Sequence, residues 1–482
     1  MILTNLNNYK DNFFSVIIIG SGPAGISTAL KLEKYKIKTL LIEAGSLEDA
    51  QNKEDFFKGN IFGDVDPNED LSLKRARMFG GTSSLWGGHC SKFEKEQFEN
   101  WPIDYGECYK FENDTNKILG LKRYHTDFYY KKFNDKFNQF HRRYASKKRF
   151  KDIYYDYIKN SKYIYLSLNT SLIKFNGSQN QIGSMECKFK GENHQIKSKY
   201  YILAAGGIEN SRLLLWSRRN NNNLFADSLP IGNYYMDHPW HTPAEGFINY
   251  NKLLKYFKNN NINREFYMDC LSRLYLSPNT EFKNKNQILS VALWLRFENK
   301  KNSNNNKNFF KKAYCVAPNF FKNYFEKNKS DDLFKFSVSL HQEQEPLSLN
   351  KISLDNNSDP FGVPYANLNW KISNKIKKTA QDSLVSLGKF LIKQNLGRIS
   401  IDEYIFKEKY NFIFGGAHQM GGTRMGKNSE TSVVDENLKV HSINNLYITG
   451  SSVFPTSGHG HPTYTIVSLS LRLGDHIKNK LT

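Results

Sequence analysis

The chain has 482 residues, a formal net charge of +21, and a composition that is 39% hydrophobic and 14% aromatic. This length exceeds what one hydrophobic core usually organises, so we expect two or more domains. The five cysteines are odd in number and lack a Cys-x-x-Cys spacing. They therefore argue against a disulfide framework and against a structural zinc site.

The excess of positive charge does not by itself indicate a nucleic-acid-binding protein. Much of the lysine is interleaved with asparagine, as in residues 300–308, and no basic block is combined with spaced stacking aromatics. Solvated loops with a compositional bias are the simpler interpretation, and attraction of an anionic substrate or a membrane surface is the alternative. We expect no nucleic-acid partner.

Signals for export and membrane insertion are also missing from the sequence. The N-terminus has no basic region leading into an apolar one. No run approaches the roughly 18 apolar residues that a membrane span needs. We therefore expect a soluble protein without a transmembrane segment, in a reducing, cytoplasmic compartment.

Three segments read as strand followed by helix. Residues 13–45 predict a strand at 16–19, a glycine turn, a helix at 24–34 and a second strand ending in an acid. Residues 200–207 form another apolar run that leads into a helix from 209 to 216. A third run at 445–450 precedes a terminal helix at 463–476. Strands separated by helices in this way favour a parallel sheet.

Other segments predict a different kind of sheet. Residues 287–297 alternate apolar and polar side chains, which suits an antiparallel strand. One amphipathic helix carries Ile376, Ala380, Leu384, Leu387 and Leu391 on a single face. Gly397 follows it and could supply a left-handed C-terminal cap.

The predicted fold class is therefore α/β, with a Rossmann-like cofactor domain and an interleaved α+β substrate domain that contains an antiparallel sheet. The cofactor domain is expected to be discontinuous, from residues 1–100, 195–235 and 410–482. The intervening residues 101–194 and 236–409 are expected to form the substrate domain.

The glycine turn has the spacing of a dinucleotide-binding motif, Gly20-Ser-Gly-Pro-Ala-Gly25. Gly20 permits the tight turn, Gly22 lets the backbone approach a pyrophosphate, and Gly25 lets the helix pack on the strand. Glu43, at the end of the next strand, can accept hydrogen bonds from ribose hydroxyls. A second glycine-rich loop, residues 77–88, could lie against a flat ring system and donate to its polar edge.

These motifs resemble those of the glucose–methanol–choline (GMC) oxidoreductases, a family of FAD flavoproteins. The resemblance extends through residues 204–210, 236–239, 343–346, 350–354 and 359–364, and through the whole of 418–477. It implies that His418, before Gly-Gly-Thr-Arg-Met-Gly, is the catalytic base, and that His461 holds the substrate hydroxyl. It implies FAD contacts at Gly20, Gly22, Pro23, Ala24, Gly25, Glu43, Gly80, Gly81, Thr82, Ser83, Trp86, Gly87, Gly88, Ala205, Gly206, Gly450, Ser451, Pro462 and Thr463.

The chain departs from the family pattern at informative positions. Members that attach FAD covalently use a histidine where this chain has Leu85, so the resemblance implies non-covalent FAD. Gly450 stands where many members have an aspartate. His89 and His459 match no catalytic position of the family, and we expect surface or supporting roles for them. No residue is expected to bind a metal.

The implied reaction is oxidation of an alcohol CH–OH group, with a sugar or glycoside as the favoured substrate class. His418 would take the hydroxyl proton while hydride passes to flavin N5, with an ionisation at about pH 6–7, the ordinary range of histidine. Oxidation of an apolar alcohol or sterol, or a non-redox lyase or isomerase reaction on the same fold, are the alternatives. The sequence leaves the electron acceptor open among oxygen, a quinone and a redox protein.

Overall fold

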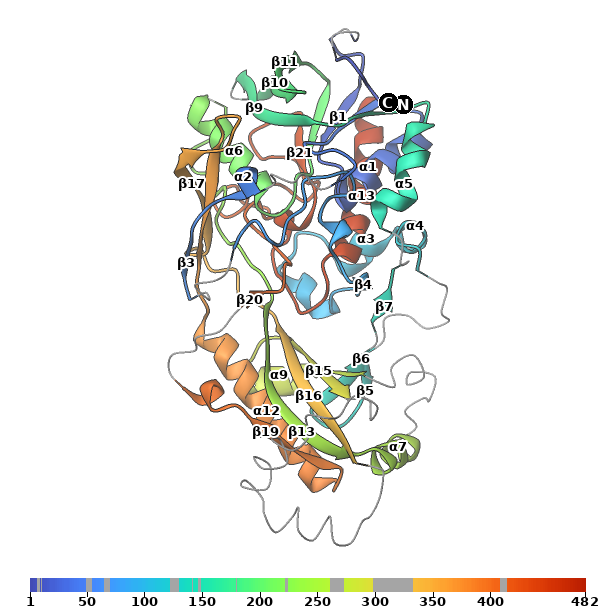
Figure 1. Ribbon diagram of the computed structural model, residues 1–482, viewed down its shortest axis with the longest axis vertical. Helices are drawn as coiled ribbons and strands as arrows, with labels where there is room; N and C mark the ends of the chain where they lie inside the picture. Colours follow the sequence, from blue (N-terminus) through green and yellow to red (C-terminus); the bar gives the residue numbers. More distant parts are fainter. Residues whose placement is uncertain are drawn as a thin grey trace.

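The structure is a computed structural model that describes residues 1–6, 9, 11–48, 54–64, 70–121, 130–140, 142–145, 149–178, 180–221, 224–260, 273–297, 333–407 and 414–482. Within these residues the chain forms two lobes, drawn one above the other in Figure 1. A parallel sheet organises the upper lobe, and an antiparallel sheet organises the lower lobe.

The parallel sheet has five strands in the order β21-β12-β1-β2-β8, and every neighbouring pair is parallel. The strands are β1 (Val16–Ile19), β2 (Thr39–Ile42), β8 (Ile164–Ser167), β12 (Tyr200–Leu203) and β21 (Leu446–Ile448). Nearly every residue in them is buried, as expected for a sheet that is covered on both faces. Helices α1 (Pro23–Lys34) and α13 (Thr463–Leu481) pack against each other beside it.

The predicted strands and helices of this lobe are confirmed, as is the Rossmann-like parallel sheet. Helix α6 (Glu209–Asn220) follows β12 as expected and is four residues longer than predicted. Strand β8 lies within 101–194, which we assigned to the substrate domain, yet it pairs with β2. The sequence of β8 alone does not indicate which sheet the strand joins, because parallel pairing connects residues that are far apart in the sequence.

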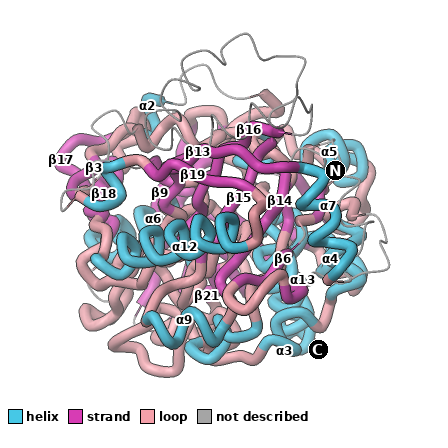
Figure 2. Tube along the Cα trace, turned by 90° about the horizontal axis from the view of Figure 1, so that it is seen from below, coloured by secondary structure: helices cyan, strands magenta, loops and turns pink. Residues whose placement is uncertain are grey.

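The antiparallel sheet follows the path β19-β13-β16-β15-β14-β6-β5, with β20 added beside β13. Helix α12 (Asn374–Lys393) lies across one face of this sheet, as Figure 2 shows from below. The strands are β5 (Tyr130–Lys132), β6 (Phe137–Phe140), β13 (Pro239–Asn249), β14 (Arg273–Pro278), β15 (Val291–Phe297), β16 (Leu333–Gln342), β19 (Gly397–Ile401) and β20 (Phe414–Gly415).

The two faces of this sheet have different tasks. On β15, Leu293 and Leu295 join the hydrophobic cluster that α12 covers, whereas Ala292 and Trp294 belong to a separate aromatic cluster. Alternation along one strand therefore divides the sheet into a core face and a face that is free to build a site.

The apolar face predicted for α12 is confirmed, because its five residues are at most 2% exposed. The predicted cap at Gly397 is wrong. Asn395 has the left-handed conformation, with φ of 49°, and Gly397 already begins β19. A Cβ at Gly397 would lie 2.1 Å from the carbonyl oxygen of Phe247 on β13, so close strand packing explains this glycine.

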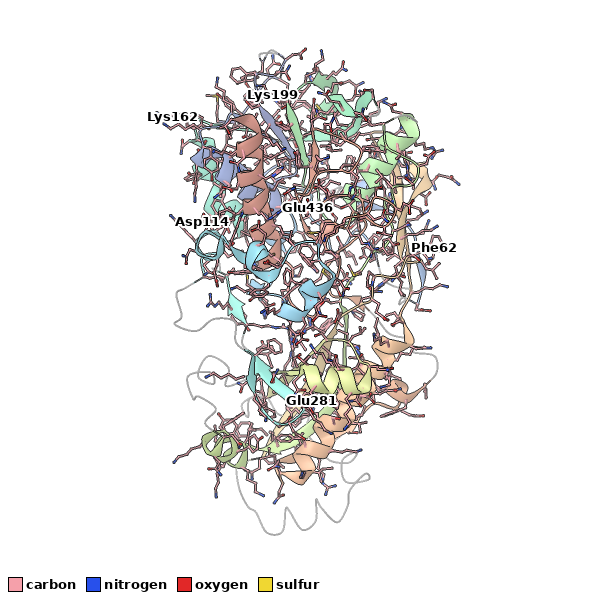
Figure 3. The ribbon with its side chains drawn as sticks, turned by 180° about the vertical axis from the view of Figure 1, so that it is seen from behind. Phe62, Asp114, Lys162, Lys199, Glu281 and Glu436 are labelled. Carbon is pink, nitrogen blue, oxygen red and sulfur yellow. The ribbon has the colours of Figure 1, made fainter. Side chains whose placement is uncertain are left out.

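Smaller elements complete both lobes; in the rear view, Lys199 marks the upper lobe and Glu281 of α9 the lower one (Figure 3). The smaller sheets combine β9 (Thr170–Ser178), β10 (Gln181–Phe189) and β11 (Glu192–Ile196); β3 (Ile61–Gly63), β17 (Lys351–Ser358) and β18 (Pro364–Trp370); and β4 (His89–Cys90) with β7 (Arg143–Tyr144). The other helices include α2 (Glu54–Phe57), α3 (Tyr105–Tyr109), α4 (Glu112–Ile118), α5 (Phe150–Lys159), α7 (Tyr250–Asn259) and α9 (Thr280–Asn286), with 3-10 turns η1 (Gly81–Ser84), η2 (Lys95–Asn100), η4 (Glu403–Phe406) and η5 (Ser451–Val453).

Among the described residues, no helix combines the length and the apolarity that crossing a membrane requires. Cys90, Cys108 and Cys187 are buried free thiols. Cys270, Cys315 and the basic stretch 300–308 lie outside the described residues.

Candidate active site

One cavity of about 690 Å³ reaches from the glycine turn after β1 to the nearest end of the antiparallel sheet. Its walls include Gly22 and Glu43 at one end, and His418, His461 and Trp294 at the other. The N-terminal glycine motif and the two C-terminal histidines therefore line a single cavity between the lobes.

The glycine end is shaped by the backbone. Gly20 has φ of 104°, and a Cβ there would lie 2.5 Å from the carbonyl oxygen of Ala204. A Cβ at Gly25 would lie 1.9 Å from the carbonyl oxygen of Gly20, so this glycine allows α1 to pack on the turn. A Cβ at Gly22 would meet no protein atom within 4 Å. Gly22 therefore keeps open the space before the N-terminus of α1, where a pyrophosphate fits.

Glu43 is buried beside this turn. Its carboxylate accepts hydrogen bonds from the backbone nitrogen and hydroxyl of Ser21, at 3.1 and 2.7 Å, and from the backbone nitrogen of Gly45 at 2.9 Å. Burial raises its pKa, and these hydrogen bonds oppose the rise. The carboxylate is thus held in place beside the cavity, which suits an acceptor for ribose hydroxyls.

Most of the residues expected to contact FAD line the cavity. Gly25, Gly80 and Gly88 are not among the lining residues. Gly80 instead joins the two glycine segments, because its backbone nitrogen donates to the carbonyl oxygen of Ser21 at 3.1 Å. The lining residues from the predicted set are Gly20, Gly22, Pro23, Ala24, Glu43, Gly81, Thr82, Ser83, Trp86, Gly87, Ala205, Gly206, Gly450, Ser451, Pro462 and Thr463.

The other end of the cavity is built from side chains. The ring centroids of His418 and His461 are 4.8 Å apart, with an interplanar angle of 74°. His418 follows β20, and His461 directly precedes Pro462 at the N-terminus of α13. His461 is 7% exposed, whereas His418 keeps part of its surface open. The predicted pair therefore meets in the cavity from two separate segments.

The antiparallel sheet adds an aromatic wall that the sequence analysis missed. Trp294 stacks on His341 with ring centroids 4.2 Å apart and an interplanar angle of 14°. Trp240 pairs with His341 across the sheet and also lines the cavity. The alternation in residues 287–297 located the strand, but the register that brings Trp294 beside His341 depends on a partner strand far away in the sequence.

Of the surface or supporting roles expected for His89 and His459, the structure rules out an exposed position, and the supporting role stays a prediction. His89 lines the cavity and stacks on His461, with centroids 5.0 Å apart and an interplanar angle of 13°. His459 is 2% exposed and contacts the ring of Phe140. The position of each histidine in its motif could not reveal this placement.

Burial lowers the pKa of His418 and of His461 well below the ordinary value of histidine. The next largest cause for His418 is the neighbouring His238, and for His461 it is the buried cation of Arg142. Both imidazoles are therefore neutral at physiological pH. The ionisation expected at about pH 6–7 is therefore moved to more acidic pH, and burial is the main cause.

Comparisons with known proteins agree with this geometry. Residues 346–470 match a family model described as GMC oxidoreductase. The fructose dehydrogenase large subunit of Gluconobacter japonicus is 23% identical over 60% of this chain and 49% of its own length. For the 2-methyl-1,2-propanediol dehydrogenase of Mycolicibacterium austroafricanum the values are 24%, 61% and 50%. The chain thus spans about half the length of the curated relatives it matches.

Solved structures show the same fold over the full chain. A formate oxidase aligns with a TM-score of 0.61 at 17% identity, covering 98% of this chain and 99% of the other. Pyridoxine 4-oxidase from Mesorbium loti aligns with a TM-score of 0.62 at 12% identity, covering 96% and 99%. Residues 346–470, which carry both histidines, therefore match a GMC oxidoreductase domain, and the full chain shares its fold with solved oxidases, among them a formate oxidase that holds FAD.

Proposed function

We propose that the protein oxidises a CH–OH group of a polyhydroxylated small molecule, such as a sugar or glycoside, to a carbonyl. The observation that carries the proposal is the position of His418 and His461, 4.8 Å apart in the cavity that also contains the glycine cradle. A base and a hydrogen-bonding partner thus lie within reach of the same bound substrate and cofactor.

Each histidine has a separate task in this reaction. His418 is neutral, so it accepts the proton of the substrate hydroxyl. His461 holds the substrate oxygen by a hydrogen bond and fixes its direction. When bound, FAD supplies the acceptor for the hydride that leaves the substrate carbon. The proton on His418 and the hydride together account for the two hydrogens lost when the alcohol becomes a carbonyl.

Buried polar atoms of the cavity lining support a substrate with several hydroxyl groups. Among the described residues, five ring nitrogens of this lining have no hydrogen-bond partner: those of Trp86, Trp240 and Trp294 and Nδ1 of His341 and His461. A buried polar group without a partner costs about 1–3 kcal/mol. Cofactor and a polyhydroxylated substrate together can supply partners, whereas an apolar alcohol would leave several nitrogens unpaired.

The names of two relatives fit this substrate class. One is the fructose dehydrogenase large subunit already described, and another is the paromamine 6'-oxidase of Streptomyces fradiae, 27% identical over 30% of this chain. The diol dehydrogenase relative also acts on a hydroxylated molecule by its name. We therefore favour sugars over sterols as the first compounds to test.

The test is anaerobic mixing of the purified protein with a panel of sugars, glycosides, aliphatic alcohols and sterols, followed by the absorbance of oxidised flavin. We expect sugars or glycosides to remove this absorbance and the other compounds to do so slowly or not at all. Preferential reduction by apolar alcohols would overturn the substrate class. Conversion of a substrate while the flavin stays oxidised would show a non-redox enzyme.

The proposal includes non-covalent FAD, because Leu85 occupies the position at which a histidine would make the covalent link. Leu85 is 49% exposed and lines the cavity. Acid precipitation should release FAD into the supernatant. Flavin that stays in the protein pellet would contradict this part of the proposal.

A further inference from the structure

His238 lies directly against the proposed base. Its Nδ1 is 2.8 Å from Nδ1 of His418, and its Nε2 is 3.1 Å from the carbonyl oxygen of Ser457. His238 is fully buried, at 0% exposure, and of these two histidines only His418 lines the cavity. The inference that follows rests on the proposed function of His418.

These two contacts determine where the protons lie. A carbonyl oxygen only accepts hydrogen bonds, so Nε2 of His238 must carry a hydrogen. Burial lowers the pKa of His238 to about 4, so at neutral pH its Nδ1 has no proton and accepts. His418 must then donate from Nδ1, which leaves its Nε2 as the unprotonated nitrogen.

The surrounding residues hold His238 in this arrangement. One carboxylate oxygen of Asp237 accepts from the backbone nitrogens of His238 and His418, at 2.6 and 2.9 Å. Gln344 closes the frame: its Oε1 accepts from the backbone nitrogen of Asp237 at 2.9 Å, and its own backbone nitrogen donates to the hydroxyl of Ser457 at 2.8 Å. The sequence motifs at 236–239 and 343–346 thus meet behind the base.

The same cluster could suggest a metal site, because ligand atoms of His238, His341 and His418 lie within 4.8 Å of one another. The distance between the two Nδ1 atoms argues against it. Two histidine nitrogens bound to one tetrahedral zinc at about 2.0–2.1 Å would lie about 3.3 Å apart. The observed 2.8 Å is the length of a hydrogen bond.

We propose that His238 is a positioning residue that fixes His418 as the Nδ1-protonated tautomer, so that Nε2 is the atom that takes the substrate proton. Nδ1 of His418 faces the protein, since a Cβ built on Gly416 would lie 3.3 Å from it. The remaining nitrogen is therefore the one available to the cavity.

The direct test is the tautomeric state of His418 in protein labelled with 15N-histidine, assigned by comparison with His418→Gln. We expect a protonated Nδ1 and an unprotonated Nε2 at neutral pH. A proton on Nε2 would overturn the proposal, as would one metal ion per chain in elemental analysis of the purified protein. This measurement needs no substrate, so it separates failure of the tautomer assignment from failure of the proposed reaction.

Two substitutions test the consequence for flavin reduction. His238→Asn keeps an acceptor oxygen near the position of Nδ1, and His238→Leu removes it. We expect His238→Leu to slow the reduction step by up to about 10⁴-fold, the loss found when a catalytic histidine is left in the wrong tautomer. His238→Asn should restore most of the rate and the Nδ1-protonated signal of His418.

His241 on the same strand provides the matched control. It is also buried, with a pKa lowered to about 4 by burial, and its ring nitrogens contact Tyr404 and Gln342. His241→Leu should leave the His418 tautomer unchanged. Equal rates for His238→Asn and His238→Leu, or an equal change of tautomer in His241→Leu, would assign His238 a merely structural role.

Discussion

The two ends of the cavity are made in different ways. The glycine end is made by backbone: a turn at Gly20, open space at Gly22 and the N-terminus of α1. The histidine end is made by buried side chains from segments that are distant in sequence, including His238, His418 and His461. Binding at an end made by backbone can be blocked by a side chain that fills its open space. The function of an end made by buried histidines depends instead on where their protons lie and on pH.

The largest expected effect is loss of FAD binding at the glycine end. Gly22→Val should abolish FAD binding and leave the fold intact, because a Cβ there meets no protein atom within 4 Å but occupies the space for the pyrophosphate. The flavin-to-protein ratio measures FAD binding, and circular dichroism measures whether the fold is intact.

Gly25→Val is the matched variant, and it should impair folding itself, because a Cβ at Gly25 would lie 1.9 Å from a backbone oxygen. An unchanged flavin ratio in Gly22→Val would show that the cradle lies elsewhere. If both variants lost FAD and folding to the same extent, Gly22 would be a packing residue like Gly25 and would not provide space for the cofactor.

At the histidine end, His418→Ala should keep FAD and slow flavin reduction by substrate by about 10²–10⁴-fold, the usual contribution of a positioned base. Anaerobic stopped-flow measurements give this rate directly. His459→Ala is the control, since His459 does not line the cavity. A wild-type rate in His418→Ala with an inactive His459→Ala would mean that the base is misassigned.

His461 should have a smaller effect that depends on the replacement. An asparagine can still hold the substrate oxygen, so His461→Asn should reduce flavin faster than His461→Ala. The apparent affinity for substrate should decline more in the alanine variant. Identical kinetics for the two replacements would argue against a hydrogen bond to substrate.

The free energy of unfolding should depend on pH because the histidine end buries neutral histidines. Burial lowers the pKa of His238, His241 and His459 to about 4. The unfolded chain takes up these protons at about pH 6.5, so stability is complete above that pH and declines as pH falls toward 4. Each histidine contributes a slope of about 1.4 kcal/mol per pH unit.

Urea unfolding at several pH values measures this slope, and His241→Asn should make it shallower. A midpoint that does not change between about pH 6.5 and 4 would contradict the burial of neutral histidines.

The smallest expected effect is on the rate itself at neutral pH. Because the pKa of His418 lies well below its ordinary value, flavin reduction should hardly change between about pH 6 and 8. The rate should decline only at more acidic pH, when the base becomes protonated. A clear sigmoidal step near pH 6.5 would show that the base is more solvated than the structure indicates.

The same contrast explains what the sequence could predict. The cradle is local, so its spacing predicted the tight turn at Gly20 and the close packing at Gly25, and the strand and helix around them are confirmed. His418 and His461 were found through motifs. His238, His341 and Trp294 were missed as site residues because strand register and loop return bring them together. Similarly, Gly397 was misjudged because its neighbour lies on another strand.

The most direct test of the account is a crystal structure of the protein with its flavin. We predict density for the pyrophosphate beside Gly22 at the N-terminus of α1, and the flavin ring extending along the cavity toward His418 and His461. A flavin bound away from this cavity, or one whose ring points away from both histidines, would contradict the central claim that cradle and histidine pair form one site.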